Sequence, residues 1–110
     1  MTIFPIIFAF IAAAVIRILQ GSATVAMITS AGLVAPLLAG HHFSGIQLAA
    51  IVASISSGSS ILSHVNDAGF WLVKQYLGLT EKQTFRSWTM MITWLALIGF
   101  LFSVLIFFIF

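Results

Sequence analysis

The sequence predicts an all-α polytopic membrane protein, and its composition is the first reason. Only 5% of the 110 residues are charged and 62% are hydrophobic, whereas soluble domains carry about 25% charged residues. This number of charged residues is too small to cover a surface in water. We therefore expect the surroundings of the chain to be mostly lipid. The length leaves room for about three or four crossings of roughly 20 residues each. Eight glycines suit the close packing of helices in a membrane.

The same composition excludes several classes of function. The chain has no cysteine, which excludes disulfides, thiolate metal sites and cysteine nucleophiles. Four basic residues form no patch for nucleic acid. No nucleophile–base pair or metal set is visible, so we expect neither an enzyme nor a cofactor. The apolar sequence begins at Ile3 without a basic residue before it, which argues against a signal peptide and favours a chain that starts inside a larger protein.

Residues 1–39 are predicted to form two apolar helices. Pro5 is acceptable in the first turn, and the stretch QGSAT, residues 20–24, interrupts the pattern. The two halves are either separate crossings or a re-entrant hairpin with QGSAT at its tip. We favour the hairpin, because the turn carries no charge and no wide polar margin. Irregular backbone at membrane depth must be buried in protein or line a watery cavity, so the hairpin makes QGSAT a candidate site.

Residues 46–79 are predicted to form an interrupted helix. The preceding stretch GHHFSG is a loop with glycine at both ends, and we interpret His41 and His42 as loop residues rather than as a metal or proton pair. The stretch SISSGSSILS, residues 54–63, is expected to be weakly helical because serine competes for backbone hydrogen bonds. The polar run SHVND follows at residues 63–67.

Residues 80–110 are predicted to form a capped final transmembrane helix. TEKQ matches a capping box, with Thr80 as the cap, and residues 88–110 carry no charge, as expected of a membrane span. Three of the four basic residues lie just before this span, which indicates that the connection is cytoplasmic; they are Lys74, Lys82 and Arg86.

Two long motifs carry a family resemblance. RILQGSATVAMITSAGLVAP, residues 17–36, and SHVNDAGFWLVKQYLGLTEKQTFRSW, residues 63–88, strongly resemble the C-terminal part of the gluconate permease family. These are proton-coupled symporters of gluconate and related sugar acids, within the wider ion-transporter superfamily. The likeness covers the chain from about Arg17 onward.

The resemblance implies a fold with two inverted repeats, each containing a re-entrant hairpin and a broken helix whose tips meet at a midplane substrate site. Residues 1–39 then look like the hairpin of the second repeat, and residues 46–79 like its broken helix. The implied location is the bacterial cytoplasmic (inner) membrane. Family members are several times longer, so the implied partners include the remaining N-terminal part of the transporter as well as the lipid bilayer.

A sugar acid presents one carboxylate and a row of hydroxyls, and QGSAT offers groups for both. Backbone N–H groups at the start of a half-helix favour anions. Arg17 either contacts the substrate carboxylate or reaches toward headgroups, and the hydroxyls either bind substrate or pack helices. The candidate substrate-binding residues are Arg17, Gln20, Gly21, Ser22, Thr24 and Asn66.

The proton of the symport is assigned to His64 or Asp67, both in SHVND. Histidine readily gains and loses a proton near neutral pH. An acid inside the bilayer costs about 2.5–3.5 kcal/mol on insertion scales, so Asp67 is expected to face a cavity or a partner. His64 shares a face with it if the helix persists between them. The competing interpretation is a turn in water, for which Asn-Asp-x-Gly is ordinary chemistry.

The predicted function is therefore the C-terminal portion of a proton-coupled transporter of gluconate or a similar sugar acid, with a homo-oligomer among its possible assemblies. The alternative is a small helical membrane protein that acts as an oligomeric or partner-binding subunit without transport of its own.

Overall fold

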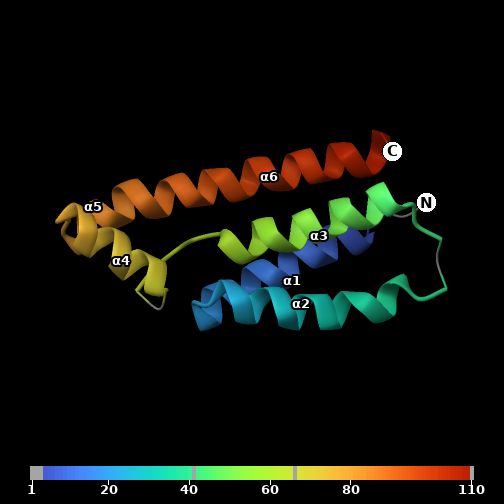
Figure 1. Ribbon diagram of the computed structural model, residues 1–110, viewed down its shortest axis with the longest axis horizontal. Helices are drawn as coiled ribbons and strands as arrows, with labels where there is room; N and C mark the ends of the chain where they lie inside the picture. Colours follow the sequence, from blue (N-terminus) through green and yellow to red (C-terminus); the bar gives the residue numbers. More distant parts are fainter. Residues whose placement is uncertain (1–3, 41, 66, 110) are drawn as a thin grey trace.

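The computed structural model describes residues 4–40, 42–65 and 67–109, and their regular structure is entirely helical, which confirms the all-α prediction. The C-terminal part of the chain forms one continuous long helix, Glu81–Ile109, which includes the last three of the segments named below. Figure 1 shows this long helix lying along the other helices, with both chain ends at the same end of the molecule. The elements are α1 (Phe4–Gln20), α2 (Ala23–Leu38), α3 (Gly45–Ser60), α4 (Ala68–Leu77), α5 (Glu81–Thr84), the π-helical segment η1 (Phe85–Thr89) and α6 (Met90–Ile109).

Helices α1 and α2 form an antiparallel hairpin with a two-residue turn. Gly21 makes the turn with a φ of 75°, a conformation that glycine adopts without steric penalty. Ser22 then caps α2, because its hydroxyl accepts a hydrogen bond from the backbone N–H of Val25 at 3.2 Å. The tip of the hairpin lies beside the link between α3 and α4 (Figure 1).

Helix α3 is the central element, and it packs against α1, α2 and α6. Ser44 and Gln47 form a capping box at its start. The expectation of weak helix in the serine-rich half was wrong, because α3 continues to Ser60. The serine hydroxyls bond to carbonyls instead of breaking the helix: Ser59 donates to Ile55 O at 2.7 Å and Ser54 donates to Ile6 O of α1 at 2.8 Å.

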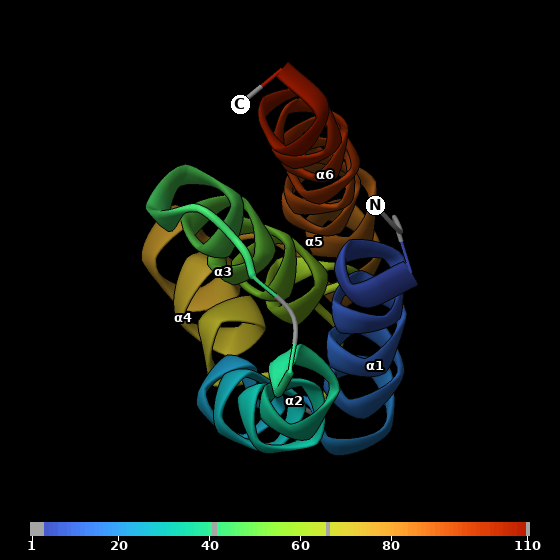
Figure 2. The same ribbon diagram turned by 90° about the vertical axis from the view of Figure 1, so that its right-hand side faces the viewer.

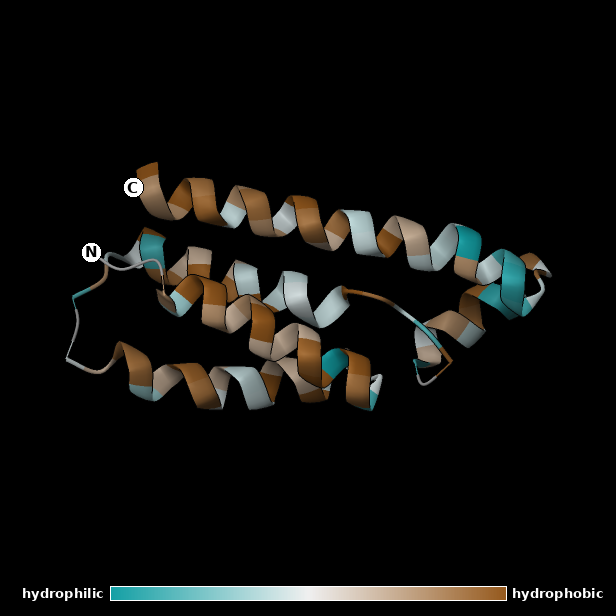
Figure 3. Ribbon diagram, turned by 180° about the vertical axis from the view of Figure 1, so that it is seen from behind, coloured by the Kyte–Doolittle hydropathy of each residue, from teal (hydrophilic) through white to brown (hydrophobic). Residues whose placement is uncertain are grey.

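The core is small and the outer surface is apolar. Figure 2 shows α1, α2, α3 and α6 grouped around the long axis, and Figure 3 shows hydrophobic residues spread over these helices. On α6, for example, Leu101 and Phe102 are more than half exposed. Such a surface suits a lipid or protein environment better than water. The core cluster consists of Ile6, Ala9, Ala13, Val34, Ala50, Ile51, Ile55 and Phe107.

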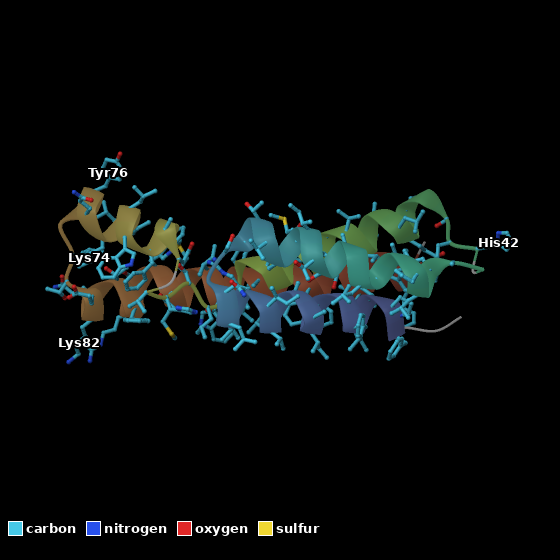
Figure 4. The ribbon with its side chains drawn as sticks, turned by 90° about the horizontal axis from the view of Figure 1, so that it is seen from below. His42, Lys74, Tyr76 and Lys82 are labelled. Atoms are coloured by element: carbon cyan, nitrogen blue, oxygen red, sulfur yellow. The ribbon has the colours of Figure 1, made fainter. Side chains whose placement is uncertain are left out.

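Helices α4 and α5 carry the charged residues Lys74, Glu81 and Lys82. Lys74, Tyr76 and Lys82 lie at one end of the molecule, and His42 lies at the opposite end (Figure 4). Thr80 accepts from the backbone N–H of Gln83, whose side chain accepts from the N–H of Thr80, so the predicted capping box is confirmed. Among the described residues, only Glu81–Ile109 is both long and apolar enough to cross a membrane.

Candidate functional site

The last turn of α1 brings a buried arginine to the link between α3 and α4. The side chain of Arg17 is only 4% exposed. Its Nη2 donates to Asp67 Oδ2 at 2.7 Å, its Nε to Ile61 O at 3.2 Å and its Nη1 to Gly21 O at 2.9 Å. One guanidinium therefore joins the hairpin tip to both ends of the non-helical link.

Asp67 is the acidic partner, and its position comes from the start of α4. It caps that helix, with Oδ1 accepting from the N–H of Gly69 at 3.2 Å. Oδ2 accepts from Arg17 and also from the hydroxyl of Ser63. Because its side chain is 15% exposed, this carboxylate lies at the edge of the protein interior with three donors around it. Such a cluster of donors stabilises a negative charge.

The long helix supplies a second layer of contacts to the link. Trp88 Nε1 donates to the Ser63 hydroxyl at 2.9 Å, and the Thr89 hydroxyl donates to Ser63 O. The N–H of Leu62 donates to Thr93 Oγ1 at 3.2 Å. Side chains of η1 and α6 thus satisfy backbone groups that the interruption of the helix leaves free, as irregular backbone in an apolar protein requires.

His64 lies in the same link but points at the hairpin. Its Nε2 lies 2.8 Å from Ile18 O in α1. Because a carbonyl oxygen only accepts hydrogen bonds, Nε2 is the protonated ring nitrogen that donates this bond. His64, Val65 and Asp67 are not helical, so the condition for a shared helical face is not met. The two residues meet instead through a turn in which the N–H of Asp67 donates to His64 O at 2.8 Å.

Four of the other predicted site residues lie at or beside the hairpin tip. Gly21 is buried and Ser22 is partly exposed at the hairpin tip, where both belong to the turn. Gln20 and Thr24 are exposed beside them. Asn66 lies outside the described residues, as does His41. His42 is exposed in the loop at the far end of the molecule (Figure 4).

Sequence reasoning did not find three of the residues that build this site. Ser63, Trp88 and Thr89 link Asp67 to the long helix, yet none of them carries a signal of its own. The Arg17–Asp67 pair did have a signal that could have been used. One basic and one acidic residue stand in otherwise apolar segments, and buried charges at membrane depth pair with one another.

A helical chain whose apolar side chains are largely exposed, and whose buried charges are paired with each other, has the build of a membrane-embedded protein. The chain belongs to the GntP permease family, whose sequence model, described as GntP family permease, matches residues 1–109. This is a family of membrane transporters and not of enzymes, as the sequence predicted.

The relatives include proteins named as gluconate transporters and gluconate permeases. The chain is 51% identical over 90 residues to the low-affinity gluconate transporter of Escherichia coli K12, a match that covers 82% of the chain and 20% of that transporter. It is 50% identical over 102 residues to the gluconate permeases of Pseudomonas aeruginosa and Bacillus subtilis, covering 93% of the chain and 22% of each permease. The chain thus spans about a fifth of the length of these relatives. No solved structure matches it.

Proposed function

We propose that the chain forms the C-terminal part of a proton-coupled secondary transporter that imports gluconate or a related sugar acid across the bacterial cytoplasmic membrane. The relatives named as gluconate permeases, at about half identity, support the substrate class. The observation that carries the proposal is the buried Arg17–Asp67 pair at 2.7 Å, where the tip of a helical hairpin meets an interrupted helix. In this role the chain contributes one half of a substrate site, and the remainder of the transporter contributes the other half.

In the proposed topology, α1 and α2 are a re-entrant hairpin, residues 46–79 are a broken helix, and Glu81–Ile109 is the final span. Helix lengths support it. At 1.5 Å per residue, α1 and α2 are about 24–26 Å long, whereas a bilayer has a hydrocarbon core of about 30 Å. Thr89 and Thr93 bond to the link beside the hairpin tip, so the tip lies level with these two residues of the long helix. At 1.5 Å per residue, this level is about 12–18 Å from the start of the helix at Glu81.

The exposure of the hairpin tip supports a half-site. Gln20 and Thr24 are exposed and Ser22 is partly exposed, so amide and hydroxyl groups are available to a ligand or to the other half of the transporter. The backbone N–H groups at the start of α2 provide positive potential for a carboxylate, and Arg17 is the charged group proposed to contact it. Asn66 is proposed for the substrate hydroxyls, and His64 or Asp67 for the proton.

A chimera tests the proposed function directly. This chain replaces the matching segment of the Pseudomonas aeruginosa gluconate permease, and uptake of radiolabelled gluconate is measured in cells without gluconate transporters of their own. We expect uptake that collapses when a protonophore removes the proton gradient. A chimera that reaches the membrane at the level of the native permease but takes up no gluconate would refute the proposal.

Labelling of introduced cysteines tests the location of the half-site. The chain contains no cysteine, so a cysteine-free permease with Thr24→Cys reports on the tip alone. Gluconate is expected to protect this cysteine from a polar thiol reagent. The matched control is Tyr76→Cys, at a position 84% exposed at the far end of α4, where gluconate should give no protection. Equal labelling of Thr24→Cys with and without gluconate would contradict a site at the tip.

A further inference from the structure

The charges at the junction add up to zero, and this constrains how an anion can bind there. Arg17 is positive, Asp67 is its contact of opposite sign, and both are largely buried. In the described part of the chain, the remaining ion pair joins Lys74 and Glu81 at 3.6 Å and is exposed. A substrate carboxylate that approaches Arg17 therefore meets a guanidinium already occupied by another carboxylate.

A second carboxylate cannot simply be added. Two negative charges would share one guanidinium, and the displaced one would stay largely buried without a positive partner, which is energetically costly. A proton on Asp67 removes this conflict. The guanidinium then lacks a counter-charge, and the carboxylate of a sugar acid restores the neutral sum. The site is neutral both before and after the exchange, so burial in lipid opposes neither state.

The contacts of Arg17 are suited to such an exchange. Ile61 O and Gly21 O hold Nε and Nη1 whether or not Asp67 is charged. Only Nη2 is given to Asp67, so protonation of Asp67 releases that donor and leaves the guanidinium oriented. A guanidinium that stays oriented without a ligand loses less conformational entropy when it binds one.

The groups around Asp67 favour it over His64 as the proton carrier. From α1 it is faced by Arg17, from its own link by the Ser63 hydroxyl, and from α4 by the N–H of Gly69. The long helix reaches it through the Ser63 hydroxyl, which accepts from Trp88, and none of these groups except Arg17 carries a charge. His64 Nε2 donates instead to Ile18 O of α1, so this ring connects the link to the hairpin.

We propose that Arg17 and Asp67 form a proton-controlled anion clamp. Asp67 holds Arg17 when it is ionised, and a proton on Asp67 transfers Arg17 to the substrate carboxylate, so that one proton enters this site for each anion bound. The inference rests on the proposed function and deepens it, because it assigns the proton to Asp67 and fixes the exchange at one for one.

Variants in the chimera separate the clamp from a purely structural ion pair. Asp67→Asn resembles the protonated state, so it should still exchange labelled for unlabelled gluconate across the membrane but no longer accumulate it in response to a pH gradient. Coupling to one proton allows about tenfold accumulation per pH unit, and the expected ratio for Asp67→Asn is about one. Arg17→Gln should lose exchange and accumulation together. The matched control, Glu81→Gln, makes the same acid-to-amide change at the ion pair outside the junction and should keep both.

Several results would overturn the clamp. Accumulation of gluconate by Asp67→Asn at the level of the unmutated chimera would refute it, as would loss of exchange in a correctly inserted Asp67→Asn to the same extent as in Arg17→Gln. Loss of coupling in His64→Gln alone would move the proton to the histidine. If the unmutated chimera transports gluconate and the variants give one of these results, the clamp is refuted and the proposed function is not. An unmutated chimera that transports nothing overturns both.

A measurement on the unmutated protein needs no variant to fold. Purified chimera in weakly buffered detergent solution, near neutral pH, should take up one proton for each gluconate bound, seen with a pH-indicator dye. A neutral sugar alcohol of the same length is the control and should bring no proton with it. Gluconate binding without proton uptake would refute the clamp.

Discussion

Gly58 of α3 offers a sharp test of how the hairpin is held against the broken helix. A Cβ atom at this position would lie 2.5 Å from Phe10 O and 2.9 Å from Ala13 Cβ, both in α1. The first of these is a backbone atom, so no side-chain rotation can relieve the clash. We therefore expect Gly58→Ala to push α1 and α3 apart.

The size of the effect follows from these distances. The 2.5 Å approach is about 1 Å shorter than an ordinary carbon contact of 3.5 Å, so the helices must separate by about that amount. Extra atoms in a packed interior typically cost about 1–3 kcal/mol, and the better helix propensity of alanine returns about 1 kcal/mol or less. The net loss expected for Gly58→Ala is up to about 2 kcal/mol. The same shift would lengthen the 3.2 Å bond from Arg17 to Ile61 O.

Thermal unfolding of the purified chimera in detergent measures the loss, with gluconate exchange as the functional readout. Gly32→Ala is the matched control, since a Cβ atom there would meet nothing within 4 Å and the residue also lies inside a helix. We expect Gly58→Ala to lower the melting temperature and slow exchange, and Gly32→Ala to do neither. Equal melting temperatures for the two variants would refute the close packing of α1 on α3.

Three smaller predictions concern the long helix. Trp88→Phe removes the 2.9 Å bond to the Ser63 hydroxyl and should lower stability by about 0.5–1.5 kcal/mol, measured by thermal unfolding; Trp94→Phe, at a position 61% exposed, is its control and should change nothing. Thr80→Ala breaks the capping box and should cost about 1 kcal/mol, seen as faster amide exchange in the first turn of α5; unchanged exchange would contradict the cap. Glu81→Gln removes only an exposed ion pair at 3.6 Å, so no measurable change in melting temperature is expected.

The local features of the fold could be predicted because each depends on neighbours in sequence. The capping box at Thr80 and the turn at Gly21 both follow from residue types within a few positions. The serine-rich half of α3 misled the same kind of reasoning. Its serines are helical because Ser54 reaches a carbonyl of another helix and Gly58 lies against α1, and sequence neighbours do not reveal either contact.

The candidate site was only half visible from the sequence for the same reason. Arg17 and Asp67 are 50 positions apart, and each was interpreted within its own motif, the arginine toward substrate and the aspartate toward a proton. Their pairing required the tip of one element to meet the gap in another. Leu62 shows the limit most clearly, since its positive φ of 49° is unusual for a leucine and no pattern of residue types announces it.

The π-helical segment Phe85–Thr89 places one additional residue in a single helix turn beside the ion pair. A π turn holds one residue more than an α turn, and such insertions often occur at functional sites. Trp88 and Thr89 are therefore both turned toward Ser63. Loss of one residue here would restore an ordinary α turn, and α6 would keep its direction because both kinds of turn close a full rotation. The additional residue thus lets the long helix present two side chains to the link without changing which sides of α6 face outward.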